Sequence, residues 1–194
     1  MKRRVFDVLA STVGLLLAVL LIVAGGLLTW AHNFVQDEVH SQLAAQKIYF
    51  PPKGSDAIKG PEFKAMQQYA GQQLTTGDQA EVYADHFIAI HLKEIGGGQT
   101  YAQLSTKAQA SPNDQQLATQ VQTMFRGETL RGLLLNAYAF GKMGTIAGIA
   151  AVVTFAGGGV ILLLAGLGYW HSRRVRPDQE LLGGQLGSHE PIPA

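Results

Sequence analysis

A charge-free apolar run from Val8 to Trp30 constrains this chain more than any other feature of its sequence. As an α-helix the run would measure roughly 34 Å, which is enough to cross the hydrocarbon core of a bilayer, about 30 Å thick. A second apolar run, Thr145 to Trp170, lies toward the other end of the chain. The sequence therefore predicts two transmembrane helices, residues 8–30 and 145–170, with residues 31–144 between them on one side of the membrane.

Basic residues predict which side that is. One lysine and two arginines lie within residues 2–4, before the first run, and three arginines follow the second run. Short basic flanks stay in the cytoplasm, so we expect residues 1–7 and 171–194 there and residues 31–144 outside the plasma membrane. The first run is longer than the core of a usual signal peptide and lacks a clean cleavage pattern, which favours an uncleaved anchor. The polar tail, residues 171–194, contains Pro and Gly and is expected to be disordered.

Composition and periodicity narrow the fold class. The formal net charge is only +1, so nothing indicates nucleic-acid binding, and the absence of cysteine excludes thiolate metal sites and disulfides. Between the two runs, apolar residues recur with helical spacing and do not alternate as in a half-buried strand. We therefore predict an all-α membrane protein whose spans flank an extracytoplasmic domain of four or five helices. These are expected at residues 33–48, 61–77, 79–95, 100–110 and from residue 112 onward, with Pro61, Asp78 and Ser111 at helix starts.

Residues 126–144 are the hardest to assign to water or to lipid. A single helix from Leu133 to Trp170 would be roughly 57 Å long, nearly twice what the bilayer needs. Asn136 and Lys142 suggest that the span begins near Thr145, with Lys142 reaching outward. We expect residues 126–144 to form an interfacial segment that either packs on the domain or lies on the membrane surface. The point where the second helix enters the bilayer stays open between Leu133 and Thr145.

Small residues recur in both spans at spacings that allow close helix contact. Gly14 and Ala18 are four residues apart, and Gly144 and Gly148 form a GxxxG pattern. Small side chains let helix backbones approach closely in lipid. We predict helix packing at these four positions and at three consecutive glycines of the second span, Gly157, Gly158 and Gly159. The contact is either with the other span or with another protein; the alternative is that small residues are simply common in membrane helices.

Acidic and histidine side chains gather in one predicted helix, which carries Glu81, Asp85, His86, His91 and Glu94. Two histidines and a carboxylate can bind iron, but His86 and His91 would point about 140° apart on a regular helix. We therefore predict no metal site, and no motif indicates a catalytic or cofactor-binding residue. The role of these five residues stays open.

The segment RGETLRG carries Arg126, Glu128 and Arg131 shortly before the second apolar run. Arginines close to a membrane can bind lipid headgroups or pair with acidic groups of a partner protein. The other interpretation is a solvated helix face with local ion pairs. We keep these three residues as candidate lipid or partner contacts.

Two stretches, residues 83–105 (YADHFIAIHLKEIGGGQTYAQLS) and residues 124–144 (MFRGETLRGLLLNAYAFGKMG), resemble a group of actinobacterial two-span membrane proteins with no assigned activity. The resemblance covers most of the chain, both spans included. Such sequences are sometimes labelled aromatic ring-opening dioxygenases, and the histidine geometry does not support that label here. The resemblance implies the envelope of a high-GC Gram-positive cell and no particular mechanism.

These features favour a non-enzymatic accessory or scaffold protein of the cell envelope. Its expected partners are membrane lipids and another membrane protein or complex, or a second copy of itself. One alternative is an extracytoplasmic sensor or ligand-binding module that signals through a partner. A second alternative is an envelope enzyme that acts on lipid or cell-wall material.

Overall fold

The computed structural model describes residues 3–174, and all regular secondary structure in this range is helical. Helices α1 (Arg3–Ala45) and α5 (Gln115–Ser172) are both, by length and composition, able to cross a membrane. The prediction of an all-α chain with two such helices is confirmed. Extended pairing among the described residues is limited to one isolated bridge between Tyr49 and Gln73. The predicted disordered tail lies, from residue 175 onward, outside the described residues.

The chain divides into two compact units, Met1–Thr29 with Ile149–Ala194, and Trp30–Gly148. We call the described part of the first, residues 3–29 and 149–174, the hairpin unit, and the second the helical domain. In the hairpin unit α1 and α5 are antiparallel, because Gly14 lies against Ala165 while Gly25 lies against Phe155. Many large apolar side chains of both helices are exposed in this unit, as expected of helices that face lipid or another protein.

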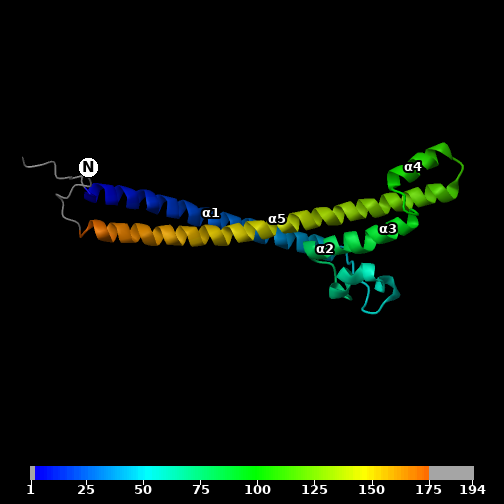
Figure 1. Ribbon diagram of the computed structural model, residues 1–194, viewed down its shortest axis with the longest axis horizontal. Coiled ribbons are helices and arrows are strands. Elements are labelled where there is room, and N and C mark those ends of the chain that lie inside the picture. The colour runs from blue at the N-terminus through cyan, green and yellow to red at the C-terminus, as the bar shows by residue number, and fades with distance from the viewer. Residues whose placement is uncertain (1–2, 175–194) are drawn as a thin grey trace, which may run out of the picture. The chain divides into compact units, whose positions relative to one another are not determined.

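Within the helical domain, α5 packs against a second helical run (Figure 1). This run consists of α2 (Gly77–Tyr83), a π-helical turn (Ala84–Ile88) and α3 (Ala89–Ile95). It is antiparallel to α5, because Gly77 at its start approaches Gly141 while Leu92 near its end covers Gly127. A shorter helix, α4 (Tyr101–Ala110), follows and buries Leu104.

Residues 126–144 belong to α5 and are helical throughout. Leu134 is buried in the core of the helical domain, and Gly141 lies against the backbone of Gly77. Lys142 donates to the carboxylate of Asp78 at 2.9 Å, and this hydrogen bond raises the pKa of Lys142. The sequence allowed this segment either to pack on the domain or to lie on the membrane surface, and in the structure it packs on the domain.

The segment between α1 and α2 differs from the sequence prediction. α1 ends at Ala45, where a helix to residue 48 was expected. The helix predicted for residues 61–77 is only a 3-10 helix (Pro61–Tyr69), although Pro61 does occupy its first position. A shorter 3-10 helix (Asp56–Ile58) precedes it. The prediction is wrong from residue 70 onward because the chain turns at Gly71, whose φ of 75° favours glycine.

After this turn the backbone runs extended beside the residues that follow α1. The amide of Phe50 donates to the carbonyl of Gln72 at 2.9 Å, and the amide of Leu74 donates to the carbonyl of Ile48 at 2.9 Å. Leu74 is completely buried. Its place on the apolar face of the predicted helix was therefore misleading, because it reaches the core from an extended segment.

Two predicted helix starts are also wrong. Thr76, rather than Asp78, caps α2: its hydroxyl accepts from the amide of Gln79, and the Gln79 side chain accepts from the amide of Thr76. Asp114, rather than Ser111, caps α5, since its carboxylate accepts from the amide of Leu117 at 2.9 Å. Thr, Ser and Asp have similar capping preferences, so closely spaced candidates are not separated by residue type.

The core of the helical domain lies on both sides of the α2–α3 run. On one side is α5, and on the other the Phe50 ring lies 5.3 Å from the rings of both Tyr69 and Tyr83. The burial of Tyr83 raises its pKa. This arrangement explains why apolar residues are spread around the circumference of the run. The largest fully buried side chains are Phe50, Ile58, Met66, Leu74, Met124 and Leu134.

Candidate functional site

In the hairpin unit, small residues line the contact between α1 and α5. Ala18 is completely buried, and a Cβ atom at Gly158 would lie 3.3 Å from the Cβ atom of Leu21. A Cβ atom at Gly14 would lie 3.5 Å from that of Ala165. Gly14, Ala18 and Gly158, all predicted as packing positions, therefore contact the other helix of the same chain. We call this contact the small-residue seam.

Gly157 and Gly159, predicted with them, do not contribute to the seam. A Cβ atom at either position would meet nothing within 4 Å. Two seam positions were missed by sequence reasoning: Gly25 makes room for the Phe155 ring, and Gly168 makes room for the hydroxyl of Ser11.

A seven-residue spacing was the signal that could have identified the seam. Seven residues make nearly two turns, so such positions share one helix face, as they do where helices pack at a small angle. The buried seam positions at this spacing are Ser11, Ala18 and Gly25 on α1, and Ala151, Gly158, Ala165 and Ser172 on α5.

In the helical domain, α1 and α5 also meet at glycines, and a histidine joins them there. His32 Nδ1 lies 2.7 Å from the carbonyl oxygen of Gly144. A Cβ atom at Gly148 would lie 2.8 Å from His32 Nδ1, and one at Gly144 would lie 3.0 Å from Cγ1 of Val35. The predicted GxxxG pair therefore makes room for His32 and Val35 of the same chain.

Two of the three charged residues of RGETLRG, Glu128 and Arg131, form ion pairs inside the helical domain. Arg131 Nη2 lies 2.7 Å from the carboxylate of Asp85 and its Nη1 lies 3.6 Å from that of Glu128. The hydrogen bond to Asp85 raises the pKa of Arg131. Arg131 lies roughly 21 Å along α5 from Thr145, the expected start of the span. Arg126 is exposed and has no ion pair within residues 3–174.

The histidine and carboxylate group is not brought together around a common point. His91 Nδ1 lies 2.7 Å from the carbonyl oxygen of Phe87, and its ring packs against the Phe87 ring at 4.4 Å. Asp85 is held by Arg131, whereas Glu81 and His86 are half-buried and Glu94 is exposed. In the part of the chain that the structure describes, no three such side chains could hold a metal ion.

The helix that carries His86 and His91 is not a regular α-helix, as the sequence analysis assumed. The amide of Ala89 donates to the carbonyl of Ala84, five residues back, which widens the helix at this turn. The angle of about 140° between His86 and His91 assumed a regular α-helix. That angle therefore does not apply to this helix. The position of the His91 ring is explained by its contacts with Phe87.

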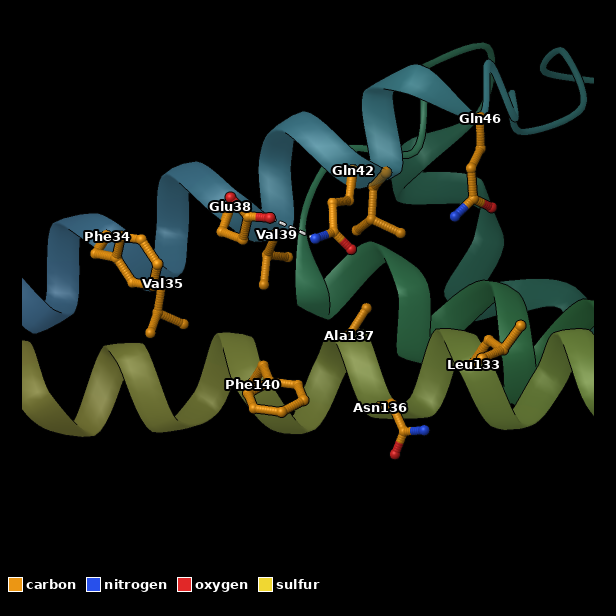
Figure 2. Close-up of a pocket in the computed structure, with 11 residues that line it drawn as sticks. Phe34, Val35, Glu38, Val39, Gln42, Gln46, Leu133, Asn136, Ala137 and Phe140 are labelled. Carbon is orange, nitrogen blue, oxygen red and sulfur yellow. Dashed lines mark hydrogen bonds between the residues drawn. The ribbon is translucent and has the colours of Figure 1, made fainter.

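An open groove of about 450 Å³ lies in the helical domain between α1 and α5 (Figure 2). On the α1 side it is lined by Phe34, Val35, Glu38, Val39, Gln42, Leu43 and Gln46, and on the α5 side by Leu133, Asn136, Ala137 and Phe140. In Figure 2, Val39 and Gln42 point from α1 toward α5, and Ala137 points back toward them. Sequence reasoning missed this groove, because its two sides are a hundred residues apart in sequence and only the fold joins them.

We expect Gly148→Ala to lower the free energy of unfolding by about 1–3 kcal/mol, because the added methyl group would displace the His32 ring. Gly132→Ala is the control: it lies on the same helix with nothing within 4 Å of an added Cβ atom. It should be neutral or stabilising by up to about 1 kcal/mol. Both variants would be heated in detergent, and the fraction of protein that stays monodisperse would be measured against temperature. Identical curves for Gly148→Ala and Gly132→Ala would contradict the contact between Gly148 and His32.

We expect Arg131→Gln to destabilise the helical domain by about 1 kcal/mol, since the ion pair with Asp85 is only partly shielded from water. Arg126→Gln removes an arginine from the same helix without removing an ion pair, and should leave the melting temperature unchanged. Circular dichroism during heating compares the two variants. If both lowered the melting temperature equally, the Asp85 pair would not be the cause.

Comparison of the chain with protein families, with curated proteins and with solved structures finds no match. Two features can contact other molecules: the exposed apolar faces of the hairpin unit and the groove of the helical domain.

Proposed function

We propose that this chain is a two-span protein of the plasma membrane, with both termini cytoplasmic and residues 31–144 extracytoplasmic. The support is the pair of long apolar helices together with the basic residues that flank them. Surface charge within the helical domain is of both signs, as in an ordinary water-exposed domain. We take the resemblance to actinobacterial proteins to mean that the membrane is that of a Gram-positive cell.

A cysteine-labelling experiment tests this orientation, since the chain has no cysteine of its own. Gln72 is exposed in the helical domain and Arg174 is exposed just beyond α5. Gln72→Cys should react with a membrane-impermeant maleimide in intact cells, whereas Arg174→Cys should react only after lysis. The reverse pattern would overturn the orientation, and labelling of both in intact cells would overturn the two-span arrangement.

We further propose that the protein is a non-enzymatic accessory or scaffold subunit that binds another membrane protein. The observation that carries this proposal is the outward position of Gly157, beside the inward-facing Gly158. The small-residue seam occupies one face of each helix, while large apolar side chains elsewhere on both helices are exposed. A partner helix could therefore approach α5 closely at Gly157 without disturbing the seam.

The contacts of the titratable residues weigh against an envelope enzyme. Asp85 and Asp78 pair with Arg131 and Lys142, and His91 is packed against Phe87. A ligand-binding module that signals through a partner is the second candidate function, and the groove between α1 and α5 favours it. The two functions are compatible, because the groove belongs to the helical domain and Gly157 to the hairpin unit.

Purification in mild detergent followed by mass spectrometry tests the accessory function. We expect a stoichiometric membrane partner, and we expect Gly157→Leu to reduce its recovery at least about tenfold by blocking close helix approach. Gly157→Leu should leave the melting temperature of the chain unchanged. Gly158→Leu is the matched variant on the inner face, and it should lower the melting temperature because its side chain meets Leu21 and Ala18.

Two outcomes would contradict this proposal. A chain that purifies alone, without a partner or a second copy of itself, would remove the accessory function. Full recovery of a partner with Gly157→Leu would remove this face of α5 from the contact.

A further inference from the structure

We propose that the groove of the helical domain binds one acyl chain of a membrane lipid, which turns out of the bilayer while the headgroup stays at the surface. This inference rests on the proposed two-span arrangement, because the lipid must enter from the adjacent bilayer.

Exposed apolar side chains lead from the expected membrane surface into the groove. On α1, Trp30 stacks on Phe34 with ring centroids 5.6 Å apart, and Phe34 lines the groove. On α5, the side chains of Ile146 and Met143 are exposed next to that of Phe140. Phe140 and Leu133 line the groove on this side. These side chains form an apolar surface on each helix that a lipid chain could follow from the membrane surface to the groove.

The groove is open to solvent at apolar side chains. Leu133 is 60% exposed, Phe140 is 56% exposed and Phe34 is 55% exposed. An acyl chain is already removed from water in the bilayer, and in the open groove its outer side would face solvent, so the chain itself gains nothing by the transfer. The driving force is the removal of these protein side chains from water, which is favourable in proportion to the apolar area covered.

The length of the groove matches one leaflet of the bilayer. Along α1 the lining residues extend from Phe34 to Gln46, which is roughly 18 Å at helical rise. One leaflet contributes about 15 Å of hydrocarbon, half the thickness of the bilayer core. Counted from Phe34, a chain of this length would reach Gln42, roughly 12 Å along the groove, and would end near Gln46.

The charge of the groove favours a neutral tail over an anionic headgroup. Glu38 is the one charged residue among the eleven that line it. Its carboxylate accepts a hydrogen bond from the side-chain amide of Gln42, as Figure 2 shows. A phosphate placed beside an unneutralised carboxylate would be repelled.

A fluorescent reporter at Gln42 tests the proposal in the full chain. Gln42 lies roughly 18 Å beyond Trp30 along α1, above the reach of lipid tails that stay in the bilayer. The Gln42→Cys variant, labelled with bimane, would be placed in nanodiscs of phosphatidylcholine with or without bromine atoms on the acyl chains. We expect brominated lipid to reduce the emission about twofold, since quenching requires near contact between bromine and fluorophore.

His40→Cys is the matched control for depth. His40 is exposed, does not line the groove and lies nearer the expected membrane surface than Gln42 by about 3 Å of helical rise. Bimane at His40 should not be quenched. Leu133→Glu, a change at an exposed position that should leave the melting temperature unaltered, should abolish quenching at Gln42 by placing a charge in the groove.

Leu27→Cys, in the first predicted span, separates failure of this inference from failure of the membrane proposal. Quenching at Leu27 without quenching at Gln42 would overturn the acyl-chain site and leave the span intact. Equal quenching at Gln42 and His40 would also overturn the site, because bilayer depth alone would then explain it. No quenching at Leu27 would overturn the two-span arrangement itself.

Discussion

Close backbone contact between α1 and α5 is the constraint on which the rest of the structure depends. In the hairpin unit the contact is made by Ser11, Gly14 and Ala18 of α1 against Gly168, Ala165 and Gly158 of α5. Such close contacts are held by dispersion, which weakens steeply with separation. One larger side chain on this face would therefore cost more than its volume suggests. In the helical domain the same two helices are joined by His32 and Gln36, which reach backbone carbonyls where glycines leave space.

The helical domain uses α5 in a second way, as the support for the α2–α3 run. Gly141 admits the start of α2 and Gly127 admits Leu92, so glycines set the spacing at both ends of the contact. Between them, the Arg131–Asp85 pair joins the π-helical turn to α5. The polar side chains that first suggested chemistry thus hold two helices together. The groove forms where α1 and α5 carry apolar residues that the α2–α3 run does not cover, and exposed apolar area of this kind usually marks a binding surface.

Sequence patterns predicted the long elements well and the short ones poorly. The apolar runs beginning at Val8 and Thr145 are unambiguous, because few soluble helices carry so many consecutive apolar residues. The residues after Pro61 show the opposite case. Leu74 has helical spacing from Met66 and Ala70, yet it reaches the core through an extended segment after Gly71. A pattern of apolar residues reports that a side chain is buried, and it does not say whether the backbone that delivers it is helical. The candidate site could be predicted only in part: the small residues were visible, but their partners and the groove were not.

What the sequence by itself determined is the all-α class and the two helices that are apolar enough to cross a membrane. These follow from composition and local periodicity, which each segment carries independently of the others. Only the tertiary structure decided which glycines face a neighbouring helix and which face outward, that Arg131 pairs with Asp85, and that Phe34 and Phe140 line one groove. Each of these depends on residues distant in sequence, and Gly157 and Gly158 show the reason most directly. They are chemically identical neighbours, and only the direction in which each points from the α5 axis distinguishes them.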